Sequence, residues 1–171
     1  MPQETLLTYL HDHLAGARVT LEILDYLQAH ATDPRLRGAA ASFTPEVEAD
    51  RDQVEALIRQ LGGSGVVREA TLWLGEKLSR LRSTMGGKSS RLAELEAVEV
   101  LALCFMGKTA MWDALQTVSS EDSSLPRLDY DGLRNRAHAQ ARRMETHRIR
   151  LVRELLQGRT LAARQPASIA G

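Results

Sequence analysis

Apolar residues recur every three or four positions along almost the whole chain, and no long stretch alternates between apolar and polar residues. Spacing of this kind places apolar side chains along one face of an α-helix. The pattern runs through residues 5–30, 43–61, 91–118 and 131–155. In the first of these segments it consists of Leu6, Leu10, Leu14, Ala17, Leu21, Leu24 and Leu27. It therefore predicts an all-α protein built from four long amphipathic helices.

Residues typical of helix boundaries mark both ends of the second segment. Asp33 and Pro34 are a favourable N-cap and first-turn pair, and Gly62 and Gly63 are a favourable C-terminal stop. These signals predict a second helix that begins near residue 34 and ends near residue 61.

Pro45 lies inside this second helix and removes one backbone donor. The helix therefore either kinks there or restarts with Thr44 as its cap. The choice matters for the core, because a restart could turn Arg51 inward in place of Asp50.

The long segment 64–90 separates the second helix from the third, and residues 66–81 within it also have a helical pattern. A connection of this length allows the third helix to run parallel to the second, as in ferritin-like bundles. We expect a ferritin-like four-helix bundle with an extra helix in the crossover between the second and third long helices. A five-helix up-and-down array is the alternative. Residues 1–164 would form one domain and residues 165–171 a flexible tail.

Composition narrows the class of protein. The single cysteine, Cys104, excludes an internal disulfide and a multi-cysteine metal site, and it lies in an apolar helix as a small core residue would. No apolar run is long enough to span a membrane, and the N-terminal sequence does not resemble a signal peptide. We therefore expect a cytoplasmic protein that does not bind membranes.

Charge is distributed unevenly although the 22 basic and 22 acidic residues balance. Residues 1–60 are acidic, whereas residues 127–164 are rich in arginine. This asymmetry favours attraction between neighbouring helices or between subunits of a homo-oligomer. It argues less for nucleic-acid binding, because no aromatic residues are interleaved with the arginines. Trp73, Trp112 and the basic fourth helix are the candidate contact surfaces.

Five polar residues interrupt the apolar faces of the helices: His13, Asp50, Glu99, Gln140 and Arg148. They would meet near the middle of the bundle. We predict a buried polar cluster in which Arg148 neutralises Asp50 or Glu99 through charge-assisted hydrogen bonds. The corresponding function is structural or protein-interacting, with no catalytic residue and no cofactor.

The alternative is a metal-binding ferritin-like oxidoreductase or storage protein that holds iron or manganese at His13, Asp50 and Glu99. A dinuclear site needs about four carboxylates and two histidines, and two helices normally supply Glu-x-x-His. No Glu-x-x-His occurs in this chain. His11 cannot join His13, because residues two apart on a helix point to different faces.

Five blocks carry a resemblance to a known family: YLHDHLAGARVTLEIL (9–24), EVEADRDQVEALIRQLGG (46–63), GEKLSRLR (75–82), ELEAVEVLALCFMGKTAMWDAL (94–115) and RAHAQARRMETHR (136–148). Together they resemble a bacterial family of uncharacterised ferritin-like four-helix proteins. The resemblance covers about residues 5–157 and implies the bundle but no established activity.

The chain departs from metal-binding ferritin-like proteins at the positions of the ligands. Val47 and Asp50 stand where the resemblance would place Glu and His. Met106 stands near the third-helix Glu, and Arg148 replaces the fourth-helix His. The resemblance thus favours the fold and weakens the metalloenzyme alternative.

Overall fold

A computed structural model describes residues 3–63, 91–121 and 125–156. These residues form four helices, which are α1 (Gln3–His30), α2 (Pro34–Gln60), α4 (Arg91–Glu121) and α5 (Tyr130–Leu156). The predicted all-α class with four long helices is confirmed. None of the helices in the described ranges is long and apolar enough to cross a membrane.

The helix ends of α2 follow the sequence signals. The Asp33 side chain accepts a hydrogen bond from the Arg35 N–H at 2.9 Å, and Pro34 occupies the first turn. At the other end, Gly62 has a φ of 75° and Gly63 N–H bonds to the Ile58 carbonyl at 2.9 Å. This is a Schellman motif, which satisfies carbonyls that a helix end otherwise leaves without partners.

Pro45 does not interrupt α2, which continues through it as one helix. Pro45 lies on the exposed side, where water can bond the carbonyl that loses its partner. The phase of the helix is therefore kept across the proline. Asp50 is buried and Arg51 is half-buried, so the uncertainty between the two residues is settled in favour of Asp50.

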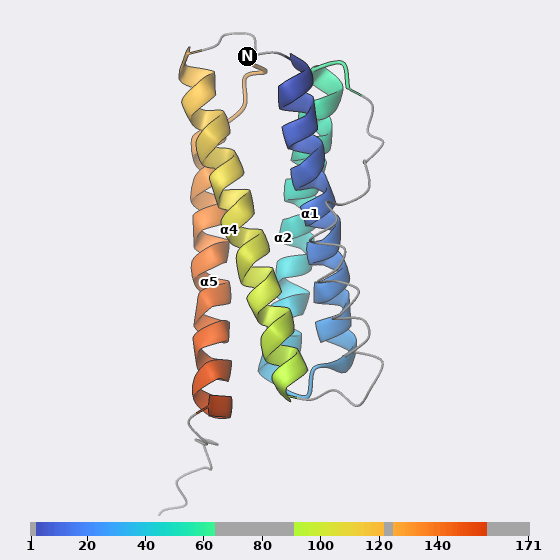
Figure 1. Cartoon of the computed structure of the whole chain (residues 1–171), viewed down its shortest axis with the longest axis vertical. Helices are drawn as coiled ribbons and strands as arrows, with labels where there is room; N and C mark the ends of the chain where they lie inside the picture. Colours follow the sequence, from blue (N-terminus) through green and yellow to red (C-terminus); the bar gives the residue numbers. More distant parts are fainter. Residues whose placement is uncertain (1–2, 64–90, 122–124, 157–171) are drawn as a thin grey trace, which may run out of the picture.

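The helices form two antiparallel hairpins, α1 with α2 and α4 with α5 (Figure 1). The hairpins pack with α1 against α4 and α2 against α5, so α2 and α4 are diagonally opposed. Figure 1 also shows that α2 and α4 run in the same direction. Consequently α2 ends at the opposite end of the bundle from the start of α4. The connection between the two helices therefore has to be long.

Parts of the sequence-based prediction fall outside the described residues. They are the extra helix at 66–81, Trp73 and the tail 165–171. Within the described part, α4 extends three residues beyond the expected end at residue 118 and reaches Glu121.

The buried apolar residues form two clusters, one toward each end of the bundle. The lower core in the orientation of Figure 1 includes Ile23, Leu24, Phe43, Leu101, Phe105 and Leu151. The upper core includes Leu10, Leu14, Leu57, Ile58, Trp112 and Leu133. Between them, toward the middle of α2, α4 and α5, lies a layer of polar residues. That layer is where the candidate site is found.

Candidate functional site

Asp50 is the centre of the layer between the two cores. It lies on α2 and is 3% exposed. One carboxylate oxygen accepts a hydrogen bond from the Lys108 ammonium of α4 at 2.7 Å. The other accepts from the guanidinium of Arg136 of α5, with Nε at 2.8 Å. Two cations from two helices therefore neutralise a single buried carboxylate.

Lys108 connects Asp50 to α5 through a second contact. Its ammonium also donates to the side-chain carbonyl of Gln140, which is 1% exposed. The ammonium lies 4.7 Å from the centre of the Phe105 ring, within the range of a cation–π contact. Burial lowers the pKa of Lys108, and the neighbouring Asp50 carboxylate opposes that shift.

Glu46 extends the network by one further turn of α2. It accepts hydrogen bonds from the Gln140 amide at 2.9 Å and from Arg143 at 2.7 Å. The guanidinium of Arg143 lies 4.3 Å from the centre of the Phe43 ring. We call the connected set the polar layer; it consists of Glu46, Asp50, Lys108, Arg136, Gln140 and Arg143.

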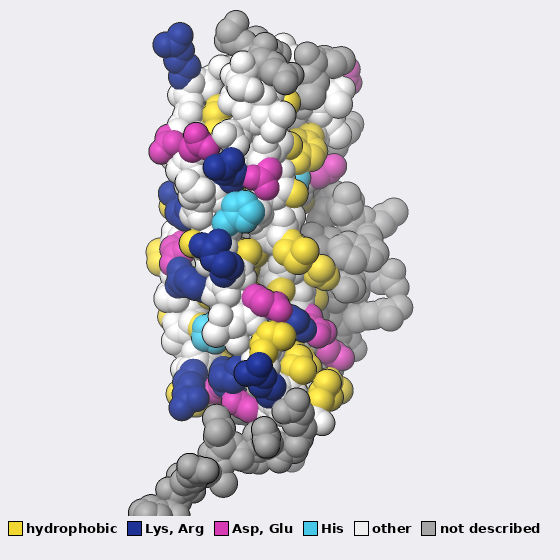
Figure 2. Space-filling view, turned by 90° about the vertical axis from the view of Figure 1, so that its left-hand side faces the viewer, with side chains coloured by type: hydrophobic (Ala, Val, Ile, Leu, Met, Phe, Trp, Pro, Cys, Tyr) yellow, Lys and Arg dark blue, Asp and Glu magenta, His cyan; other side chains and the backbone are white. Residues whose placement is uncertain are grey.

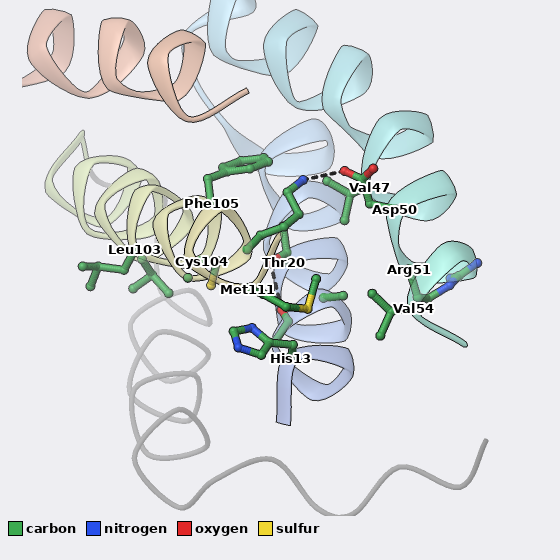
Figure 3. A pocket seen from close by; sticks show the side chains of 15 residues that line it. His13, Thr20, Val47, Asp50, Arg51, Val54, Leu103, Cys104, Phe105 and Met111 are labelled. Carbon is green, nitrogen blue, oxygen red and sulfur yellow. Dashed lines mark hydrogen bonds and ion pairs between the residues drawn. The ribbon is translucent and has the colours of Figure 1, made fainter. Parts of the chain in front are cut away.

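A cavity of about 320 Å³ adjoins the polar layer on its α1 side (Figure 3). Its walls come from three helices and are mostly apolar. They are formed by His13, Gly16, Ala17 and Thr20 of α1, by Val47, Asp50, Arg51 and Val54 of α2, and by Val100, Leu103, Cys104, Phe105, Gly107, Lys108 and Met111 of α4. None of these residues belongs to α5, so Asp50 and Lys108 separate the cavity from the α5 half of the polar layer.

His13 is a half-buried histidine in the cavity wall. Its ring packs edge-on against Tyr9, with the centroids 4.6 Å apart. Among the described residues, none hydrogen-bonds the imidazole nitrogens. Burial lowers the pKa of His13, and the neighbouring Asp12 carboxylate partly opposes the shift. Near neutral pH the ring is therefore uncharged, with one nitrogen that donates and one that accepts.

The five sequence-predicted polar residues are placed in three different surroundings. Asp50 and Gln140 are buried and share Lys108 as a partner. His13 lines the same cavity as Asp50 but does not bond to it, and Figure 3 shows the two on different sides of the cavity. Glu99 and Arg148 lie apart from the polar layer, on the outside of the bundle.

The surface position of Glu99 and Arg148 is a correction to the predicted cluster. Glu99 has a side chain that is 49% exposed and meets Arg148 at 3.8 Å. Arg148 bonds mainly to Glu145 on its own helix, at 2.7 Å. The buried face of α4 passes instead through Val98 and Leu101, and leaves Glu99 outside. Asp50 is neutralised by Lys108 and Arg136, not by Arg148.

Four members of the polar layer were not recognised from the sequence: Glu46, Lys108, Arg136 and Arg143. Lys108 is three residues after Phe105 and four before Trp112, both fully buried, which is the signal that it shares their face. Trp112 is itself 0% exposed, so it does not provide the contact surface proposed for it from the sequence.

Glu94 is a second buried carboxylate, at the lower end of the bundle, and is 0% exposed. It accepts hydrogen bonds from the backbone N–H and the hydroxyl of Thr32 in the α1–α2 connection, the hydroxyl at 2.6 Å. Arg91 donates to its other oxygen at 3.1 Å and also contacts Glu154 of α5. Glu94 therefore joins the α1–α2 connection to α4, and Arg91 extends the contact to α5; Glu94 is not among the residues of the cavity wall.

The acidic side chains that could bind a metal are dispersed. In the ranges that the structure describes, no group of three or more His, Cys, Asp or Glu side chains is placed to hold a metal ion. His13 and Asp50 share the cavity wall, but Glu99 faces away from it. The contacts of the polar layer are those of a network of ion pairs and hydrogen bonds.

The charged residues of α5 are largely paired with acidic residues of neighbouring segments. Arg136 contacts Asp50, Arg143 contacts Glu46, and Arg150 contacts Asp33. Figure 2 shows the α5 side of the molecule, where basic and acidic side chains are mixed over the surface. The charge asymmetry of the sequence therefore acts, at least in part, between adjacent helices.

A scan of protein-family models, a search of curated proteins and a search of solved structures each found no match to this chain.

Proposed function

We propose that the chain is a non-catalytic, ferritin-like helical bundle with a structural or protein-interaction role and no functional di-iron site. The observation that carries this proposal is the surroundings of Asp50. Lys108 and Arg136 already occupy its two oxygens with positive charge. A guanidinium remains protonated and cannot ligate a metal. Positive side chains thus already neutralise the buried carboxylate that a metal ion would need as a ligand.

The ferritin-like assignment rests on connectivity. Ferritin-like bundles have one long crossover, which makes the second and third helices parallel. The parallel, diagonally opposed arrangement of α2 and α4 supports this assignment (Figure 1). The resemblance of the five sequence blocks supports it independently of the arrangement.

Metal loading tests the proposal directly. The purified chain would be incubated aerobically with ferrous iron or manganese and desalted, and its metal content would be measured. We expect no stoichiometric retention. Retention of about two ions per chain, as in a dinuclear centre, would contradict the proposal if it were lost in Asp50→Ala or Glu99→Ala. Because Glu99 is exposed, Glu99→Ala should stay folded. A loss of metal in this variant could therefore be attributed to the removed carboxylate and not to unfolding.

Asp52→Ala is the matched control for the metal experiment. Asp52 is two residues after Asp50 on α2, but its side chain is 62% exposed and pairs with Arg51. A metal content that falls equally in the Asp52 and Asp50 variants would indicate adventitious surface binding.

We also propose that the chain self-associates as a homo-oligomer, with α4 at the contact. Leu92 and Met106 are large apolar side chains of α4 that are 56% and 63% exposed. Sedimentation equilibrium would measure the oligomeric state of the wild type, of Met106→Gln and of Ala41→Gln on the exposed side of α2. We expect association that Met106→Gln weakens and Ala41→Gln preserves; a monomer at all concentrations would contradict this proposal.

A further inference from the structure

We propose that the cavity between α1, α2 and α4 binds a small, uncharged and mostly apolar molecule that carries one hydrogen-bonding group. This inference adds a ligand to the molecule and does not depend on the absence of metal or on self-association.

The size and chemistry of the cavity are those of a ligand site. Cavities that bind small molecules are about 300–1,000 Å³, mainly apolar, and contain a few polar groups that orient the ligand. This cavity is about 320 Å³ and has Val54, Val100, Phe105 and Met111 among its apolar walls. An apolar cavity of about 150 Å³ holds one benzene ring, so this one accommodates a molecule of about two rings.

Two glycines keep the cavity open at a cost in helix stability. Gly16 of α1 and Gly107 of α4 both lie in its walls, and a Cβ added to either would meet no atom within 4 Å. Glycine inside a helix costs about 1 kcal/mol relative to alanine. Packing does not require glycine at either position. Both residues instead preserve open space, which a bound molecule would use.

The charges beside the cavity favour an uncharged ligand. Asp50 and Lys108 are the charged groups of its inner wall, and they are paired with each other at 2.7 Å. Arg51, at the rim, bonds to Asp52 at 2.8 Å. A charged ligand would enter a mostly apolar space in which the charged side chains already have partners. Burying its charge there would be costly, because no free counter-charge is present to pair with it. An uncharged ligand leaves the ion pairs intact.

His13 supplies the polar contact. Figure 3 shows its ring near Met111 in the cavity wall, across the cavity from Val54. The uncharged imidazole offers one donor and one acceptor, and no described residue uses either. A hydroxyl, amine or carbonyl at one end of the ligand would form a hydrogen bond with the His13 imidazole.

Fluorescence titration with 1-naphthylamine tests the proposal. This probe is uncharged at neutral pH, has two fused aromatic rings that carry one amino group, and its emission moves to shorter wavelength in apolar surroundings. We expect saturable binding of one probe per chain. Gly16→Leu and Gly107→Leu each place a side chain in the cavity, so each should weaken binding at least tenfold. His13→Phe keeps the ring contact with Tyr9 and removes the hydrogen bond, which should weaken binding about fivefold.

Gly38→Leu is the matched control. Gly38 is also inside a helix, and a Cβ added there also meets no atom within 4 Å, but it lies outside the cavity wall. Its variant should bind the probe as the wild type does. Far-UV circular dichroism and urea unfolding would establish that each variant is folded. The proposal is overturned by the absence of saturable binding, by wild-type affinity in both cavity variants, or by equal loss in Gly38→Leu.

Discussion

Asp50 is a carboxylate at the centre of a helical bundle, and its two oxygens are each paired with a cation. Burial of a charge without a partner costs several kcal/mol, so Lys108 and Arg136 make the position tolerable rather than strongly stabilising. Each partner also comes from a different helix. The position of α2 along the bundle is thereby coupled to the positions of α4 and α5.

Asp50→Asn should destabilise the protein by about 3–5 kcal/mol, because it leaves the buried Lys108 ammonium without its counter-charge. Urea unfolding followed by circular dichroism would measure the free energy of unfolding. Asp52→Asn removes an exposed partner of Arg51 and should change it by less than about 1 kcal/mol. Equal effects of the two substitutions would show that Asp50 is not a buried charge in solution.

Two histidines should make stability fall on acidification. Burial lowers the pKa of His13, with Asp12 opposing; burial and the positive charge of Arg150 lower the pKa of His147, with Asp33 opposing. Below about pH 6.5 the unfolded chain binds protons at these sites that the folded chain does not, so unfolding is favoured as pH decreases.

The measurement is the free energy of unfolding between pH 7.5 and pH 5. The double substitution His13→Gln and His147→Gln should flatten the dependence on pH. His30→Gln, at an exposed position, is the control. An unchanged slope in the double variant would show that neither histidine is protected from protonation in the folded state.

Residue placement was predictable only where the helical phase was clear. Gln140 lies on a well-defined apolar face and is buried. Asp50 is also buried, but its placement depended on whether α2 keeps its phase through Pro45. α4 is apolar around much of its circumference, with exposed Leu103 and Met106, so its buried face is ambiguous from spacing alone. Because of that ambiguity, Glu99 was expected to be buried, although it is exposed. The burial of Lys108 was not predicted, because charged side chains usually lie at the surface.

At the scale of helices, the two contacts between the hairpins differ in chemistry. α2 and α5 are joined mainly by long charged side chains: Arg136 with Asp50, Arg143 with Glu46, and Arg150 with Asp33. α1 and α4 also pack against each other, and Gly16 and Gly107 leave open space in the cavity wall beside that contact. Charge therefore aligns one side of the bundle, while small side chains leave space on the other.

Glycines in this chain should respond to alanine in opposite ways, depending on the local backbone. Gly62 ends α2 with a φ of 75°, a conformation that costs other residues about 1–2 kcal/mol. Gly38 is inside the helix and has open space around it. Urea unfolding should show Gly62→Ala to be destabilised by about 1 kcal/mol and Gly38→Ala to be stabilised by a similar amount. Stabilisation by both substitutions would contradict the Schellman motif.

The elements themselves followed from the sequence because their signals are local. Asp33, Pro34 and the two glycines act within one turn of the chain, and the structure places the helix ends where they predict. The persistence of α2 through Pro45 was not predictable from the same signals. It depends on the proline facing solvent, which is a property of the assembled bundle.

At the scale of the molecule, the all-α class and four helices were predictable, whereas the division of the interior was not. Apolar spacing alone describes one continuous core. The structure has an upper and a lower core, with the polar layer between them. The buried polar residues at this level are Asp50 and Gln140, and their partners Lys108, Arg136 and Glu46 come from three different helices. Such convergence cannot be read from any one helix.

The cavity also determines how the molecule should respond to hydrostatic pressure. Unfolding under pressure is driven by the loss of internal void volume, so a protein with an open interior space has a larger volume decrease on unfolding. Gly107→Leu should reduce that decrease, and Gly38→Leu should leave it unchanged. High-pressure fluorescence of the buried Trp112 would measure both, with Trp73→Phe as the common background. If Gly107→Leu and Gly38→Leu unfold with the same volume decrease, water already fills the cavity at atmospheric pressure.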